Sequence, residues 1–294
     1  MICAALTASS GLLGTVPAED TERSVEHEGL TMFQMVARAD IVVHVRVTEG
    51  AARFAIVEVR STLKGQPPDT QLRIDFRDLN LSLHGQTPVV FRPEEEYVLF
   101  LMKKLWRRPK EKNANILDLL HGRRGRIQLS PEGWQSMVDA VRAFVPLAQA
   151  GPEEQFDGLR AILPTDNPIL REAALDELAR LKAADQEDLP VLLRLLGDPS
   201  PRIRSRVLLL IALQFALAHS DDLQGTPDQT EALARVLERA RGDEDAVVRA
   251  ESVRTLGAWP APNDVRGDLR AIARQDTSQT VRYEAERILF RMKP

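Results

Sequence analysis

Residues 197–213 read GDPSPRIRSRVLLLIAL, and the arrangement returns at 242–259 as GDEDAVVRAESVRTLGAW and at 275–290 as QDTSQTVRYEAERILF. In each stretch a turn containing aspartate is followed by an apolar residue, an arginine, and further apolar residues at helical spacing. This spacing predicts an amphipathic helix that begins just after the turn. A fourth copy starts near Asn167 and contains Leu170-Arg171, so the pattern indicates an internal repeat.

The four copies keep a common register. Their apolar starts are 33, 45 and 33 residues apart, and the longer interval holds a polar, turn-rich insertion at 218–228. The segments that precede the copies are amphipathic as well, and they predict a first helix in each unit: 153–163, 188–196, 229–241 and 264–274. One helix pair cannot bury its own apolar stripe, so neighbouring pairs are expected to stack.

These stretches resemble the HEAT-repeat family, in the short bacterial form related to the phycobilisome-lyase-type repeats. In that family an aspartate before the second helix and an arginine on it form ladders between neighbouring units. The resemblance implies this structural role for the residues at the matching positions: Asp198, Asp243, Asp276, Arg171, Arg204, Arg249 and Arg282. Thr165 stands where the first unit would carry its aspartate, which suits an atypical terminal repeat.

The first half follows a period of two instead. Short β-branched runs lie at 41–47, 54–59, 72–76, 89–91, 97–102, 115–117 and 126–129. They predict a small antiparallel barrel or sandwich, with a short helix at 30–37 before it and a longer helix at 133–148 after it. The segments 39–43, 59–65 and 94–101 resemble OB-like domains that precede HEAT repeats in some exported bacterial proteins.

The predicted organisation is therefore a multidomain α+β chain. A signal peptide spans 1–18, a β-rich OB-like domain with its closing helix spans 19–150, and an all-α HEAT-like solenoid of about four helix pairs spans 151–294. The segment 1–18 is uncharged and ends in Val16-Pro17-Ala18, a small-residue spacing that signal peptidase favours. We expect an exported protein, periplasmic or secreted, with a cytoplasmic location as the alternative. The longest later apolar run, Val207–Ala218, is too short to cross a bilayer.

Composition excludes several kinds of chemistry. The only cysteine is Cys3, so a disulfide scaffold and a cysteine-based zinc site are ruled out. The five histidines have no metal-binding spacing, and nucleophile elbows, Walker loops and GxGxxG motifs are absent. We predict no cofactor, no metal and no enzymatic activity. His44 lies opposite the valines of its strand and is expected to face solvent.

Positive charge is concentrated in one predicted hairpin. Residues 103–126 carry nine basic residues and two acidic ones, with Trp106 among them. The candidate anion-binding residues are Lys103, Lys104, Arg107, Arg108, Arg123, Arg124 and Arg126. Binding of nucleic acid or an anionic surface is one interpretation, and a solvated hairpin whose long side chains cover apolar surface is the other. The overall pI near 5.8 does not favour a nucleic-acid binder.

The sequence thus predicts a non-catalytic protein-binding or scaffolding module that uses the solenoid surface to bind a protein or peptide. Nucleic-acid or anionic-surface binding through the basic hairpin is the first alternative. A HEAT-like enzyme, such as a bilin lyase or a DNA glycosylase, is the second, because a fold does not fix a function. The acidic repeat half, with few aromatic residues, does not favour the glycosylase.

Overall fold

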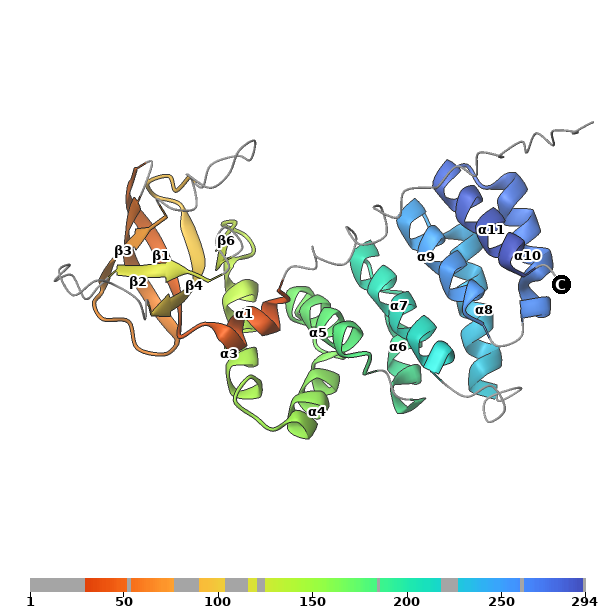
Figure 1. The fold of residues 1–294 in the computed structure, drawn as a ribbon, viewed down its shortest axis with the longest axis horizontal. Coiled ribbons are helices and arrows are strands. Elements are labelled where there is room, and N and C mark those ends of the chain that lie inside the picture. Colours follow the sequence, from red (N-terminus) through yellow and green to blue (C-terminus); the bar gives the residue numbers. More distant parts are fainter. Residues whose placement is uncertain are drawn as a thin grey trace, which may run out of the picture. The chain divides into compact units, whose positions relative to one another are not determined.

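The structure is a computed structural model that describes residues 30–51, 54–76, 90–103, 116–120, 125–183, 186–217, 227–259 and 262–292. A sheet and a series of helices are both present (Figure 1), so the predicted mixed α+β class is confirmed. Residues Thr31–Pro294 form one compact unit. The predicted signal peptide at 1–18 and most of the insertion at 218–228 lie outside the described residues.

Among the described residues the sheet has six strands: β1 (Ile41–Gly50), β2 (Phe54–Lys64), β3 (Gln71–Asp75), β4 (Glu96–Lys103), β5 (Ile116–Leu119) and β6 (Arg126–Gln128). β1 pairs antiparallel with both β2 and β4, and β2 pairs antiparallel with β3. β3 runs parallel to β5, which in turn pairs with β4. The pairings therefore lead from β1 through β2, β3, β5 and β4 back to β1, and β6 pairs with β4 beside β5.

The alternating side chains of these strands form one apolar core. Val43, Val45 and Val47 of β1 lie in it together with Tyr97 and Leu99 of β4. Val90 and Phe91, which the sequence places in a strand, lie outside the described strands. Phe91 is nevertheless buried in the same core, where its ring packs 5.3 Å from that of Phe76 and 5.0 Å from that of Tyr97. Its apolar character therefore reflects burial in a loop, which sequence periodicity does not distinguish from a strand.

β1 is buried on both faces, and the expected exposure of His44 is wrong. The His44 side chain is buried, and Trp134 at the start of α3 (Trp134–Leu147) stacks on its imidazole ring with a 5.5 Å centroid separation. Its Nε2 lies 3.0 Å from Oε2 of Glu96 on the neighbouring strand. α3 is distant in sequence, so strand alternation alone could not indicate that this face of β1 is covered.

The helix that precedes the sheet, α1 (Met32–Arg38), is bonded at its C-terminal end to the last residue of β2. Thr31 and Gln34 form a capping box at the start of α1. At its end, the Lys64 ammonium donates hydrogen bonds to the carbonyl oxygens of Val36, at 2.7 Å, and Ala37, at 3.0 Å. Such bonds satisfy carbonyl groups that have no partner within a helix. Burial lowers the pKa of Lys64, and nearby Asp40 opposes this shift.

The helices after residue 150 occur as pairs close to the predicted positions. In chain order they are α4 (Pro152–Ile162) and α5 (Pro168–Leu181), α6 (Leu189–Leu195) and α7 (Pro201–Leu217), α8 (Pro227–Gly242) and α9 (Ala246–Gly257), and α10 (Pro262–Gln275) and α11 (Gln279–Arg291). A short 3-10 turn, η2 (Gln186–Asp188), precedes α6. Asn167 and Asp245 cap α5 and α9 through their side chains, as is common at helix starts.

Packing follows the order of the chain. Each first helix contacts the second helix of its pair, and α5, α7, α9 and α11 contact one another in succession (Figure 1). The first member of this row, α5, is covered by α1 and α3. The Thr31 hydroxyl donates a hydrogen bond to Glu177 of α5, and the Asn167 amide donates one to the Ser136 carbonyl, at 2.8 Å. α1 and α3, which flank the sheet in sequence, are thus bonded directly to the region of α5.

Replacing Gly65 by alanine is expected to destabilise the protein. Gly65 has φ of +69°, and an added Cβ would overlap the backbone carbonyl oxygen of Asp40, just before β1. A left-handed residue with a side chain costs about 1–3 kcal/mol, and the overlap adds to this. Urea unfolding measures the loss. Gly267→Ala is the matched control, because an added Cβ meets nothing within 4 Å in helix α10, and it should stabilise by about 0.5–1 kcal/mol. An equal response of both variants would contradict the close approach at Gly65.

Candidate functional site

Three of the four predicted arginines, Arg171, Arg204 and Arg249, bind the turns of two successive helix pairs. The Arg204 guanidinium donates from Nη1 to the carbonyl oxygens of Asp198, at 2.9 Å, and Pro199, at 3.2 Å, in the turn before its own helix. Its other edge meets the carboxylate of Asp243 in the next unit, with Nε–Oδ2 at 2.9 Å and Nη2–Oδ1 at 2.7 Å. One planar guanidinium thus connects two turns, a geometry that a lysine side chain does not offer.

Arg249 repeats this geometry one unit later. Its Nη1 donates to the Asp243 carbonyl oxygen at 2.8 Å, while Nε and Nη2 meet the Asp276 carboxylate at 2.9 and 3.1 Å. Arg171 differs, because Nη1 donates to the Thr165 carbonyl oxygen and only Nη2 meets the Asp198 carboxylate, both at 2.6 Å. The Nε of Arg171 is buried without a hydrogen-bond partner.

The three aspartates also shape the turns in which they lie. Oδ1 of each aspartate accepts the backbone N–H two residues later, which holds the turn that leads into the second helix. Burial opposes the charged form of Asp243 and Asp276. Hydrogen bonds from the arginines and from these amides outweigh it, so the pKa of both carboxyl groups is lower than usual. The Arg204 and Asp243 side chains are only 5% and 1% exposed, so the pair is closed to a ligand.

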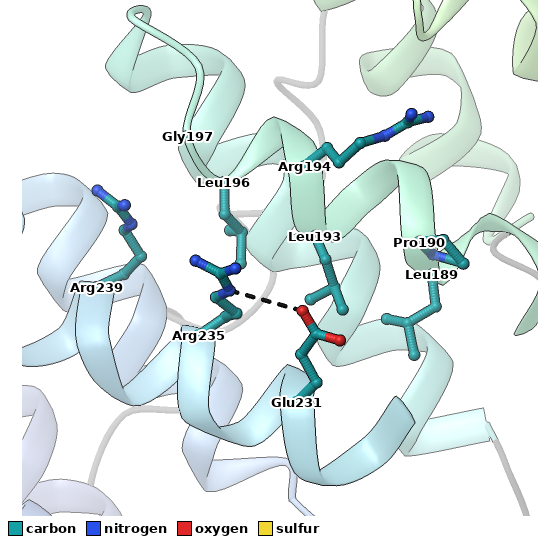
Figure 2. A pocket seen from close by; sticks show the side chains of 9 residues that line it. All are labelled: Leu189, Pro190, Leu193, Arg194, Leu196, Gly197, Glu231, Arg235 and Arg239. Atoms are coloured by element: carbon teal, nitrogen blue, oxygen red, sulfur yellow. Dashed lines mark ion pairs between the residues drawn. The ribbon is translucent and has the colours of Figure 1, made fainter. Parts of the chain in front are cut away.

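A cleft between α6 and α8 is open to solvent and is the stronger candidate site. Its volume is about 580 Å³. Leu189 and Leu193 of α6, with Leu196 just after it, supply apolar surface, while Arg235 and Arg239 stand on α8 (Figure 2). The remaining lining residues are Pro190, Arg194, Gly197 and Glu231. α8 lies within the long 45-residue interval, but the sequence did not indicate a cleft, because its lining is divided between two helices that come together only through packing.

The arginines of the cleft differ in how firmly they are held. Arg235 lies 3.8 Å from both Glu231 and Glu238, beyond hydrogen-bond distance, and its side chain is 54% exposed. Arg239 reaches Asp243 at 3.5 Å and therefore adjoins the Arg204–Asp243 pair. The exposed pairs of Arg235 contribute little to stability. In Figure 2 the guanidinium groups of Arg194, Arg235 and Arg239 stand apart around the cleft and do not converge on one point.

A second cavity, of about 590 Å³, lies beside β4 and the start of α3. It contains Glu94, Glu95 and Glu96, but each of these carboxylates already has a partner in the chain. Glu94 pairs with Arg46, Glu95 accepts from the Tyr97 hydroxyl at 2.5 Å, and Glu96 bonds His44. Burial, followed by the hydrogen bond to Glu95, raises the pKa of Tyr97 to about 12. This set of paired groups is a weaker candidate than the α6–α8 cleft.

Most of the predicted basic hairpin lies outside the described residues. Lys104, Arg107, Arg108, Arg123 and Arg124 are among those not described. Arg126 packs over the rings of Phe91 and Tyr97, 4.8 and 5.5 Å from their centroids, and donates to the Val90 carbonyl oxygen. The backbone N–H of Lys103 donates to Asp40 at 2.7 Å, and its side chain is exposed. Of the seven candidate residues the structure thus describes only Lys103 and Arg126, and their contacts are with different parts of the chain.

The ranges that the structure describes contain no group of three or more His, Cys, Asp or Glu residues arranged to hold a metal ion. None of the described helices combines the length and the apolar character needed to cross a bilayer.

No family model and no curated protein matches the sequence. Among solved structures, the crystal structure of an engineered protein from the Northeast Structural Genomics Consortium is similar to 54% of this chain and to 76% of its own length. The TM-score is 0.39 and the sequence identity is 18%.

Arg204→Ala should destabilise the protein by about 3–5 kcal/mol, because it removes the two short hydrogen bonds to the buried Asp243 carboxylate and leaves only the longer contact with Arg239. Arg249→Ala should have a similar effect. Arg282→Ala should cost about 0–1 kcal/mol, because Arg282 pairs with no aspartate among the described residues. Urea unfolding of the full chain measures the three losses. Arg202→Ala is the control, since the Arg202 side chain is 81% exposed. Negligible losses at all four positions would mean that the pairs do not hold the stack.

Stability should also fall in acid in a way that depends on Asp243. The lowered pKa values of Asp243, Asp276 and Glu284 mean that these groups bind protons less readily when folded. Their contribution is therefore complete from about pH 5 upward, above the unfolded pKa values, and is lost as pH falls through the lower folded values. Urea midpoints from pH 7 to 3 should show a shallower decline for Asp243→Asn, which does not titrate. An unchanged pH dependence would contradict the lowered pKa of Asp243.

Proposed function

We propose that this protein is a non-catalytic binding module that holds an acidic segment of a partner protein in the α6–α8 cleft. The observation that carries the proposal is an open cleft with three arginines, one glutamate and an apolar lining. Leucine side chains offer burial for an apolar residue of the partner, and the arginines offer charge-assisted hydrogen bonds to carboxylates. Because the guanidinium groups stand apart, an extended segment with several carboxylates matches them better than one small anion.

The proposal includes a HEAT-like solenoid for the four helix pairs and an OB-like barrel for the sheet. Contacts of α5, α7, α9 and α11 in succession, with an arginine between successive turns, support the solenoid. Strand pairings that return to β1 support the barrel, since a closed sheet has no unpaired edge. We further propose that the chain is exported and that its signal peptide spans 1–18.

Anionic-surface or nucleic-acid binding through 103–126 remains the alternative from another class. The engagement of Arg126 with Phe91 and Tyr97 does not favour it, because that guanidinium already has partners in the chain. Steep salt dependence of single-stranded nucleic-acid affinity would favour it.

A displayed library of 12-residue peptides, selected on the full chain, tests the proposed cleft. We expect the selected peptides to be rich in Asp and Glu around an apolar residue. Fluorescence anisotropy should show binding weakened about five- to tenfold in Arg235→Ala, and lost in Leu193→Asp, which places a carboxylate in the cleft. Arg202→Ala on α7, outside the cleft, is the matched loss of one positive charge. Binding that all three variants leave unchanged would contradict the assignment of the cleft.

A further inference from the structure

The last repeat arginine, Arg282, is held in the same pose as its counterparts. Its Nη1 donates to the carbonyl oxygens of Asp276, at 2.6 Å, and Thr277, at 3.2 Å. Arg204 and Arg249 make the equivalent pair of bonds to their own turns. One edge of the Arg282 guanidinium is therefore fixed by its own unit.

The other edge of Arg282 is open. In Arg204 and Arg249 this edge, made of Nε and Nη2, binds the aspartate of the following unit. Within the described ranges, Nε and Nη2 of Arg282 have no such partner. A guanidinium that is already oriented loses less conformational freedom when it binds a carboxylate. Nε and Nη2 of Arg282 are therefore preorganised to bind a carboxylate.

The stacking face of α11 carries exposed aromatic residues beside this arginine. Tyr283 and Phe290 are seven residues apart, so they lie on one side of the helix, and they are 63% and 69% exposed. The equivalent positions on α9 are Ala250, which is buried, and Gly257, where an added Cβ would meet Ile288 of α11. On α9, then, this face packs against the next helix through small residues. On α11 the same face presents two large rings.

A second copy of this chain is a poor occupant for that face. Head-to-tail stacking would bring the first unit to Arg282, and that unit has Thr165 where the others have aspartate. α1 and α3 also cover α5 at that end. A further helix pair packed on α11 as closely as α11 packs on α9 would collide with the rings of Tyr283 and Phe290.

We propose that the face of α11 formed by Arg282, Tyr283 and Phe290 docks a helix of another protein. That helix would carry an aspartate at its N-terminal turn, to meet the open edge of Arg282, and small residues opposite the two rings. This inference rests on the proposed function as a binding module and adds a second contact surface to it. Such helix recognition uses an oriented charge pair for register and aromatic burial for affinity.

A library of displayed helical peptides with one fixed Asp in the first turn and randomised remaining positions supplies the probe. It is selected on the full chain and counter-selected on Arg282→Ala. We expect peptides with small residues along one side that lose affinity by about tenfold in Arg282→Ala. The same peptides should lose no further affinity for that variant when their Asp is replaced by Asn. Arg282→Lys keeps the positive charge but cannot form a bidentate pair with a carboxylate, so it should recover only part of the lost affinity. Folding of each variant is checked by its urea midpoint.

The outcomes separate this proposal from the α6–α8 cleft. Peptides for the α11 face should bind Arg235→Ala normally, and peptides for the cleft should bind Arg282→Ala normally. Failure to recover any peptide that distinguishes Arg282→Ala would overturn the α11 proposal while leaving the cleft proposal standing. Concentration-dependent dimerisation that Arg282→Ala abolishes would also overturn it, by assigning the face to a second copy. The proposal would also be overturned if a cysteine introduced by Tyr283→Cys reacted slowly with a thiol reagent in the full chain and rapidly once residues 1–29 were removed. That result would assign the face to the N-terminal segment of this chain.

Discussion

The arginine–aspartate bond between successive turns is the interaction on which the helical part depends. One guanidinium holds the turn of its own unit and the carboxylate of the next, so it fixes both the local turn and the spacing between units. Leucine and valine side chains supply most of the burial, but apolar contacts have no direction and do not by themselves set register. The directional bond supplies it, and the nearly complete burial of Arg204 and Asp243 makes loss of either partner costly.

The same geometry explains where ligands are expected. Where an arginine binds the aspartate of the next turn, its side chain is largely buried and stabilises the packing of the helices. Where the series is irregular, at the α6–α8 interval and at the last helix, cationic groups are left with loose partners or an open edge. Both proposed binding surfaces therefore lie where the regular spacing of the helix pairs is interrupted or ends.

Much of this was predictable from the sequence, and the limits have physical causes. Local spacing indicated all four helix pairs and the positions of Asp198, Asp243 and Asp276, because a helix shows its period within a few residues. The cleft was not predictable, since Leu193 and Arg235 come together only through packing. His44 and Phe91 were misjudged for related reasons: a helix from elsewhere covers the first, and a loop buries the second. Strand alternation carries no information about such long-range contacts.

The hydrogen bond from Thr31 to Glu177 joins residues 146 positions apart. A ribosome adding ~5–20 residues per second needs roughly 7–30 s to make that stretch. During that interval α1 has been synthesised but α5, against which it packs, has not. The apolar side of α1, including Phe33 and Val36, therefore stays only partly covered in the nascent chain until α3 and then α5 follow, and apolar surface exposed in this way favours aggregation during synthesis.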